Sequence, residues 1–250
     1  MLLRNWYQIY SIALLIASVI APHVQADSPK NLAPSASDRV IAIDILLLPD
    51  TTMVKKAEAA NKRLRSNYPE GYTLGTEQIA HISLIHRYVH EKDLPAIEEA
   101  ISKVVAAEKP LDWKLNATGI DSSMWDGVAI TGIAVERTPD LSRLQSEIEK
   151  AVEPLAAKGG TKAAFNTTRE LPKIEPAIVD YVENFVPKSS GENYKPHVTI
   201  GVARNTFVTR MKAEPFKKFS FKPAGVAIYQ LGGFGTAQKE LWKWNPTHSK

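Results

Sequence analysis

The chain contains no cysteine among its 250 residues. It therefore has no disulfide framework, no thiolate nucleophile and no cysteine-ligated zinc site. Small disulfide-stapled secreted modules are excluded, so a hydrophobic core must hold the fold together, and a chain of this length can build one. The chain also lacks a large excess of charge of either sign, because 31 Lys and Arg against 27 Asp and Glu leave a formal net charge of only +4. We therefore expect no stable binding of duplex nucleic acid, although a mild positive charge suits an anionic substrate.

Apolar runs long enough to span a bilayer are missing as well. The stretch Ile12–Ile20 near the N-terminus is too short. Arg4 precedes it, Pro22 follows it, and Val24-Gln25-Ala26 offers small residues where a signal peptidase reads. We expect residues 1–26 to be a signal peptide cleaved after Ala26, with a retained N-terminal anchor as the alternative. A bacterial periplasm is the most economical compartment, with no membrane attachment after cleavage.

The rest of the chain is expected to form a single domain over residues 39–246. Residues 27–38 are rich in Ser, Ala and Pro and predict a flexible lead-in, and 247–250 form a tail. The irregular stretch around 158–193 is interpreted as an insertion. Hydrophobic periodicity predicts strands over Val40–Leu48, Ala80–Val89, Leu111–Ile120, Val128–Val135, Pro196–Ala203, Phe219–Leu231 and Lys239–Trp244. Helices are predicted over Thr51–Arg65, Leu94–Ala107, Leu141–Ala156, Ile174–Phe185 and Phe207–Lys212.

The order of these elements suggests an internal duplication. The same order of elements occurs twice, once from His81 and once from His197. In each case a histidine strand is followed by a short helix, a proline and a long strand. This order predicts an α+β fold with two lobes, each an antiparallel sheet with helices outside. The two lobes would face each other across a central cleft, and the insertion would shape the substrate side of that cleft.

Two short segments contain the residues with catalytic potential: His81-Ile82-Ser83-Leu84 and His197-Val198-Thr199-Ile200. In each, a histidine is followed two positions later by a hydroxyl residue, with apolar residues between them. Positions i and i+2 share one face of a strand, so each strand should present an imidazole beside a hydroxyl. Two histidines can share the acid and base roles of phosphodiester cleavage at neutral pH, and hydroxyl donors can stabilise the phosphate oxygens.

Residues near the two motifs are weaker candidates for the cleft. Arg87 falls on the same face as His81 if the first strand continues regularly, so it could reach phosphate. Tyr194 and Lys195 immediately precede the second strand and could border the cleft. Arg204 follows that strand and is a similar candidate.

Three further residues are predicted from strand parity and burial. His86 and His90 have the opposite parity from the first motif, so they should point away from the site. Asp44 interrupts an otherwise apolar strand. It could orient a catalytic histidine or simply be a buried acid with a partner, and the sequence favours neither reading.

The segments His81-x-Ser83 and Pro196-His197-Val198-Thr199-Ile200 resemble the motifs of the two-histidine (2H) phosphoesterases. This superfamily includes bacterial RNA 2′,5′-ligase-like proteins and 2′,3′-cyclic nucleotide phosphodiesterases, and the order of elements over 39–246 is similar to theirs. The resemblance implies that one of His81 and His197 acts as the general acid and the other as the general base. The sequence leaves open which histidine has which role. The resemblance also implies phosphate contacts from Ser83 and Thr199 and a reaction without metal or other cofactor. Ser83 departs from the commoner threonine but keeps the hydroxyl donor.

A signal peptide favours hydrolysis over ligation, because neither ATP nor a tRNA-splicing partner is available outside the cell. We expect a monomeric phosphodiesterase acting on a 2′,3′-cyclic phosphate or a related small nucleotide or RNA-end phosphodiester. A non-catalytic periplasmic protein that binds a nucleotide or phosphate ligand is one alternative, and an RNA 2′,5′-ligase-like enzyme is another. A histidine-based metal hydrolase is disfavoured, because the spacing of His81, His86 and His90 does not bring them to one strand face.

Overall fold

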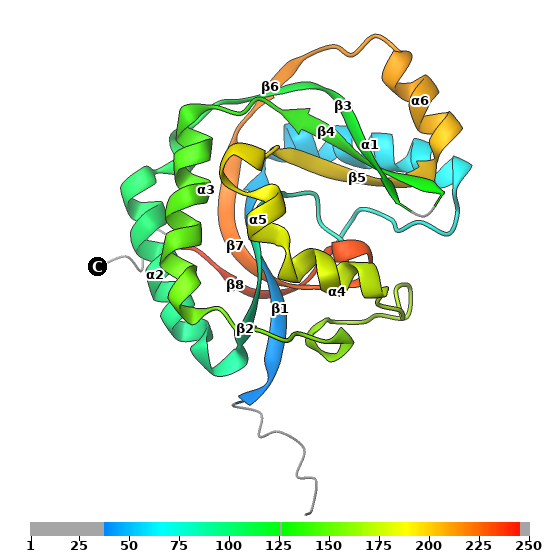
Figure 1. Cartoon of the computed structure of the whole chain (residues 1–250). Coiled ribbons are helices and arrows are strands. Elements are labelled where there is room, and N and C mark those ends of the chain that lie inside the picture. Colours follow the sequence, from blue (N-terminus) through cyan, green and yellow to red (C-terminus); the bar gives the residue numbers. More distant parts are fainter. Residues whose placement is uncertain (1–37, 126, 246–250) are drawn as a thin grey trace, which may run out of the picture. The chain divides into compact units, whose positions relative to one another are not determined.

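A computed structural model gives the arrangement of residues 38–125 and 127–245 (Figure 1). The expected signal peptide (1–26), the expected lead-in up to residue 37 and the expected tail (247–250) lie outside the described residues. Within the described ranges, no helix is long and apolar enough to cross a membrane.

The first sheet combines strands from the two ends of the described chain. It contains β1 (Val40–Pro49), β2 (Ile82–His90), β7 (Pro223–Leu231) and β8 (Ala237–Lys243), in the order β2-β1-β7-β8, with every pairing antiparallel. β1 is buried along nearly its whole length, which explains its almost unbroken apolar sequence. Asp44 is the one charged residue inside it.

The second sheet is formed by the middle of the chain. It contains β3 (Leu115–Trp125), β4 (Val128–Val135), β5 (His197–Arg204) and β6 (Phe219–Phe221), in the order β5-β4-β3-β6, again antiparallel throughout. β3 begins later than the predicted Leu111, because Pro110–Asp112 forms a 3₁₀ turn before it. Each sheet therefore contains one of the two histidine strands.

The single closing strand expected over Phe219–Leu231 is wrong, because this segment forms two strands in different sheets. The break falls at Lys222, whose backbone N–H donates to the carboxylate of Asp50 at 2.9 Å instead of to a neighbouring strand. Pro223 then has no N–H to give to a ladder. The chain passes from β6 in the second sheet to β7 in the first at this point.

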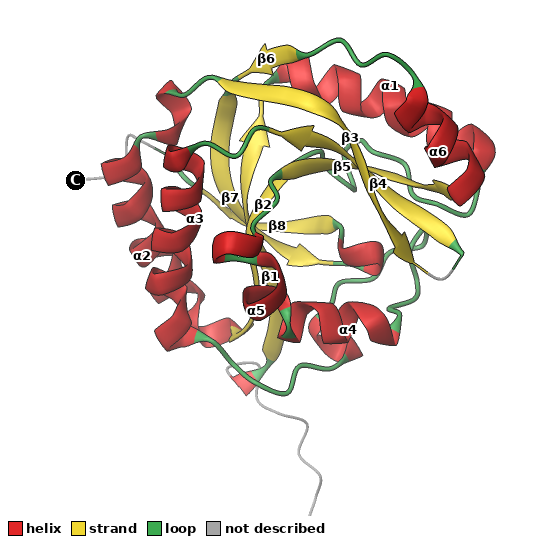
Figure 2. Cartoon of the chain, turned by 45° about the horizontal axis from the view of Figure 1, so that its top comes forward, coloured by secondary structure: helices red, strands yellow, loops and turns green. Residues whose placement is uncertain are grey.

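Helices lie around the outside of the strands (Figure 2). α1 (Thr51–Asn67) packs on β5, and α6 (Asn205–Ala213) lies beside β3, β4 and β5. α2 (Leu94–Glu108) and α3 (Pro139–Val152) pack on each other, and α3 also contacts β2. Where one helix was expected over Ile174–Phe185, the structure has two, α4 (Pro176–Glu183) and α5 (Phe185–Ser189), joined at Asn184. The 3₁₀ turns are Glu91–Asp93, Pro110–Asp112, Glu153–Leu155, Lys162–Ala164, Gly191–Asn193 and Gly233–Gly235.

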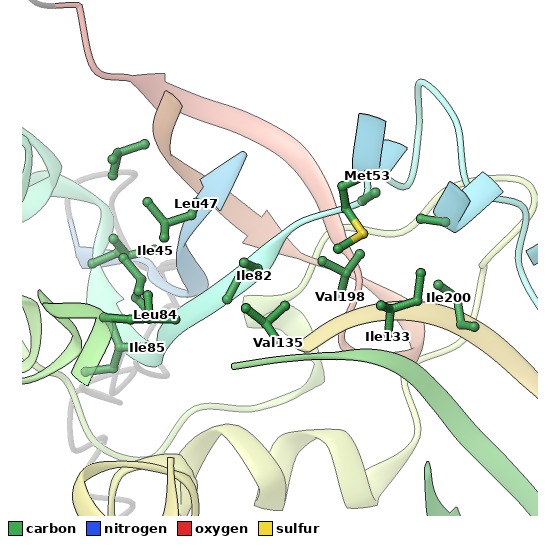
Figure 3. Packing of buried hydrophobic residues seen from close by; sticks show 14 of the residues in the cluster. Ile45, Leu47, Met53, Ile82, Leu84, Ile85, Ile133, Val135, Val198 and Ile200 are labelled. Atoms are coloured by element: carbon green, nitrogen blue, oxygen red, sulfur yellow. The ribbon is translucent and has the colours of Figure 1, made fainter. Parts of the chain in front are cut away.

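One hydrophobic core joins the two sheets. Figure 3 shows Ile82 of β2 and Val198 of β5 in this core, together with Ile45 of β1 and Ile133 of β4. The apolar residue of each motif is thus buried beside its histidine, which fixes the strand face that the histidine occupies. The predicted α+β fold with two lobes built on antiparallel sheets is confirmed.

Candidate active site

A cleft of about 560 Å³ receives residues from both histidine strands. His81 directly precedes β2 and Ser83 lies within it, while His197 and Thr199 belong to β5. All four side chains line the cleft. The structure therefore brings together the four residues of the two motifs, as the sequence predicts.

The two imidazoles are oriented in the same way. Nδ1 of His81 lies 2.7 Å from the carbonyl oxygen of Ile79, and Nδ1 of His197 lies 2.8 Å from that of Lys195. A carbonyl oxygen can only accept, so in both rings Nδ1 carries a proton and donates it. Nε2 is consequently the second nitrogen of each ring: that of His197 has no hydrogen-bond partner among the described residues, whereas that of His81 faces a carboxylate at 3.1 Å. The repeated contact, to the carbonyl two residues earlier, supports the predicted duplication.

His197 lies against a glycine on the neighbouring strand. A Cβ atom at Gly132 of β4 would be 2.9 Å from Cδ2 of His197 and 3.3 Å from the carbonyl oxygen of Val198. Carbon atoms do not approach so closely without a shift, so the absence of a side chain at Gly132 gives the imidazole its place. The side chain of His197 is exposed to the solvent of the cleft.

Asp44 of β1 connects three polar residues on the first histidine strand. Its side chain is fully buried, and its Oδ2 atom lies 2.7 Å from Oγ of Ser83, 3.1 Å from Nε2 of His81 and 3.2 Å from Nε2 of His86. The sequence left open whether Asp44 orients a catalytic histidine or is only a buried acid with a partner. The structure places it in direct contact with His81.

The expectation that His86 points away from the site is wrong, because a β-bulge reverses the parity of the first histidine strand. The pairing of β1 with β2 passes from Ile45 opposite Ile85 to Leu46 opposite Ser83, so Leu84 is an extra residue. Ser83 and His86 consequently share a face, and His86 lines the cleft. The apolar alternation of the sequence gives no sign of this bulge.

The same bulge removes Arg87 from the cleft. Arg87 was expected on the face of His81, but it lies on the opposite face, forms an ion pair with Glu153 and is not part of the cleft lining. His90 lies outside the cleft, with its ring nitrogen 3.4 Å from the carbonyl oxygen of Asp38. The predicted reason is wrong, because the bulge gives His90 the same parity as His86; it lies outside the cleft because it is at the far end of β2. Arg204 is exposed at the end of β5 and also lies outside the lining.

Tyr194 and Lys195 border the cleft as predicted. Tyr194 is buried, and its hydroxyl donates to the backbone carbonyl of Ser83 at 3.2 Å. This hydrogen bond connects the segment before the second motif with the first motif. Burial raises the pKa of Tyr194, which keeps its phenol neutral and able to donate. Lys195 is exposed, and its carbonyl oxygen holds the ring of His197.

The irregular segment over 158–193 supplies residues that the sequence did not single out for the site. Tyr181 of α4 and Phe185 of α5 line the cleft, and Lys188 of α5 lies there as well. The ring of His86 stacks on Phe185 with a centroid distance of 4.6 Å and meets Tyr181 edge-on at 5.4 Å. Aromatic residues in an irregular segment were the only sequence signal for this contact.

The glycine-rich turn before β8 also reaches the cleft. Phe234 lines it and adopts a left-handed backbone conformation with φ of 57°. Such a conformation is unfavourable for a bulky residue and is often found at functional sites. The ring of Phe234 lies 5.8 Å from that of Tyr72, which also lines the cleft.

The surroundings of the two catalytic candidates shift their pKa values in opposite directions. Burial alone would lower the pKa of His81, but the hydrogen bond and the charge of Asp44, with the Ile79 carbonyl, raise it above its ordinary value. The cleft walls replace bulk water around His197 and lower its pKa. Positive charge on His81 and His86 also lowers it, against the opposing effects of the Lys195 carbonyl and of Asp121.

Asp44 remains ionised in this environment. Burial alone would raise the pKa of its carboxyl, but the charges and hydrogen bonds of His86 and His81 outweigh burial and lower the pKa to about 2. The carboxylate and the imidazoles of His81 and His86 thus form a hydrogen-bonded cluster, and His197 comes from the other histidine strand.

A two-lobed α+β fold that brings two His-x-Ser/Thr strands to one cleft is the arrangement of the two-histidine phosphoesterases. The family model described as the 2′-5′ RNA ligase superfamily matches residues 54–225, and the chain belongs to this superfamily. Membership supports a phosphoesterase or ligase enzyme.

Solved structures with a similar fold include TT0787 of Thermus thermophilus, which is 14% identical with a TM-score of 0.47 and matches over 82% of this chain and 97% of its own. LigT of E. coli complexed with 3′-AMP is 12% identical with a TM-score of 0.43, over 82% of this chain and 98% of its own. No curated protein matches the chain.

Proposed function

We propose that the protein, once exported and cleaved after Ala26, is a monomeric phosphodiesterase that hydrolyses a 2′,3′-cyclic phosphate or a related small nucleotide or RNA-end phosphodiester. The observation that carries this proposal is the pairing of His81 and His197 in one cleft with pKa values shifted in opposite directions. Titratable groups whose environments push their pKa values apart are suited to opposite acid and base roles. In this proposal His197 is the base and His81 is the acid.

The proton positions support this assignment. Nδ1 of His197 donates to the Lys195 carbonyl, so Nε2 of the neutral ring has the free lone pair that a base needs. Both ring nitrogens of His81 face acceptors, the Ile79 carbonyl and Asp44, and its pKa is raised, so its Nε2 carries a proton that can be given away. The base and the acid are thus both in their required states near neutral pH.

In the proposed reaction, Nε2 of His197 takes a proton from a water molecule as the water oxygen attacks phosphorus. The bond from phosphorus to one ribose oxygen breaks, and Nε2 of His81 gives its proton to that oxygen. The product is a phosphomonoester, and exchange of one proton with solvent restores each histidine. Thr199 lines the cleft beside His197, where its hydroxyl can donate to a phosphate oxygen. The single hydroxyl proton of Ser83 is donated to Asp44, so we assign the phosphate contact to Thr199 and leave Ser83 bound to the carboxylate.

The remaining lining favours a small anionic substrate that contains an aromatic ring. The cleft volume of about 560 Å³ is within the range of small-ligand sites. Lys188 and Lys195 provide positive charge, and Tyr181 and Phe234 provide ring faces on which a nucleobase can stack.

The first test is hydrolysis of a phosphodiester panel by the purified protein in the presence of EDTA. We expect turnover of at least one 2′,3′-cyclic nucleotide, with a phosphomonoester as product, because the proposed reaction uses only the chain's own acid and base. Loss of activity on chelation would instead support a metal hydrolase. Binding of a nucleotide without turnover would identify a binding protein, and joining of RNA ends would identify a ligase.

The pH dependence of kcat/KM provides a second test. The acid limb should report protonation of His197, and it should lie below the ordinary imidazole pKa of 6.5 because the pKa of this ring is lowered. The alkaline limb should report loss of the proton from His81 and should lie above 6.5. We therefore expect a plateau that extends to both sides of pH 6.5 in the wild type. If the acid limb disappears in a His81 variant but persists in a His197 variant, the two roles are reversed.

A further inference from the structure

Asp44 belongs to neither histidine motif, yet it contacts both residues of the first motif. Its Oδ2 atom has three neighbours that can donate: Oγ of Ser83, Nε2 of His81 and Nε2 of His86. Its Oδ1 atom is buried and has no hydrogen-bond partner within the described part of the chain. A carboxylate oxygen has two lone pairs and can accept two hydrogen bonds at full strength. Three donors at Oδ2 therefore exceed its lone pairs by one.

Loss of one donor would therefore leave this oxygen satisfied. If His81 turns its Nε2–H toward a leaving oxygen, Ser83 and His86 still donate to Asp44. If His86 were absent, the same movement would leave a buried carboxylate with one hydrogen bond, which is costly. The third donor thus makes release of His81 easier.

The geometry of His86 suits this role. Its Nδ1 atom is buried and, among the described residues, without a partner, whereas Nε2 faces Asp44 at 3.2 Å and Oγ of Ser83 at 3.1 Å. In the tautomer with its proton on Nδ1, that N–H would have no acceptor, and the lone pair of Nε2 would face the carboxylate of Asp44. Both are unfavourable, so Nε2 carries the proton. The stacking of the ring on Phe185 holds this orientation.

We propose that Asp44 and His86 are positioning residues for the catalytic acid: Asp44 holds the ring of His81 and the hydroxyl of Ser83, and His86 keeps the carboxylate hydrogen-bonded when His81 gives up its proton. The catalytic part of this inference rests on the proposed function. The holding of His81 by Asp44 is a property of the protein without substrate and can be tested separately.

Few other titratable groups lie around the cluster of Asp44, His81 and His86. Among the described residues, no lysine or arginine forms an ion pair with Asp44, and the two histidines are its nearest donors besides Ser83. The titratable groups on the surrounding elements are Tyr229 of β7, Tyr181 of α4, Lys188 of α5, Tyr194 before β5 and His197 of β5. The hydroxyl of Tyr229 donates to Glu240, away from the cluster.

The decisive experiment is an NMR titration of the His81 imidazole in the full chain, compared between the wild type and Asp44→Asn. The amide keeps the shape and one acceptor but removes the charge. We expect His81 to titrate at a lower pH in this variant, and the alkaline limb of kcat/KM to move in the same direction. Asp121→Asn is the matched control, because Asp121 is a carboxylate of the same cleft that acts on His197. In this control the titration of His81 should stay where it is in the wild type.

An unchanged His81 titration in Asp44→Asn would overturn the proposal, whether or not the enzyme turns over a substrate. A wild type that hydrolyses nothing would contradict the proposed function only, because the titration needs no substrate. The two failures are therefore distinguishable.

If Asp44→Asn does not fold, two variants at His86 test the proposal instead. His86→Gln retains an N–H donor toward Asp44, whereas His86→Phe retains the ring stack on Phe185 but has no donor. We expect kcat of His86→Phe to be about tenfold or more below that of His86→Gln, with similar KM, because a hydrogen bond to a buried charge is lost. Equal kcat values in the two variants would overturn the proposal.

Discussion

His197→Ala is expected to lower kcat by a factor of about 10²–10⁴, which is the contribution typical of a positioned general base. His81→Ala should have an effect of the same size through loss of the acid. The His197 variant is the cleaner of the two, because its side chain is exposed in the cleft and its ring nitrogen contacts only the Lys195 carbonyl among the described residues. Its removal should therefore leave the thermal unfolding temperature almost unchanged. Single-turnover kinetics at saturating substrate would measure the loss directly.

The matched control for this prediction is His90→Ala. His90 lies outside the cleft and contacts the backbone of Asp38, so its loss should not change kcat. In the double variant His81→Ala/His197→Ala, we expect the factor by which kcat falls to be much smaller than the product of the two single-variant factors. The reason is that an acid and a base that act in one step are not independent. Retention of full turnover by His197→Ala would contradict the base assignment.

The central part of this site could be predicted from the sequence because its geometry follows from strand periodicity. Within each motif the histidine and the hydroxyl residue are two positions apart, and their apolar partners face the opposite way into one core. That pattern places each histidine beside its hydroxyl residue, and the repeated order of elements predicted that the two strands share one cleft. The order of elements similarly predicted the two antiparallel sheets.

The sequence could not predict the parts of the site that depend on an irregularity or on a distant contact. One extra residue, Leu84, moves His86 into the cleft and Arg87 out of it, and bulges have no reliable signature in a single sequence. The contact of Asp44 with His81 depends on the pairing of two strands that are separated by a helix and a loop. The position of Phe185 depends on the path of an irregular segment.

The second large effect is expected on stability. Asp44→Ala should lower the free energy of unfolding by about 3 kcal/mol near pH 5, because it leaves the buried donors of His81 and His86 without their acceptor. Chemical denaturation at a series of pH values would measure the loss. Asp50→Ala is the matched control. That carboxylate caps α1 by accepting from the N–H groups of Thr52 and Met53, and it also accepts from the N–H of Lys222. Removal of an N-cap costs up to about 2 kcal/mol, so the loss should be smaller than at Asp44.

The difference between the wild type and Asp44→Ala should also depend on pH in a characteristic way. The pKa of Asp44 is lowered from 3.8 to about 2 on folding, so its contribution is complete above 3.8 and is lost as the pH falls through about 2. The pKa of His81 is raised above 6.5 on folding, so its contribution is complete below 6.5 and is lost as the pH rises through the folded value. The difference should therefore be largest between about pH 4 and 6.5 and smaller on either side. A difference that does not vary with pH would mean that the carboxylate stabilises the fold through its shape and not through its charge.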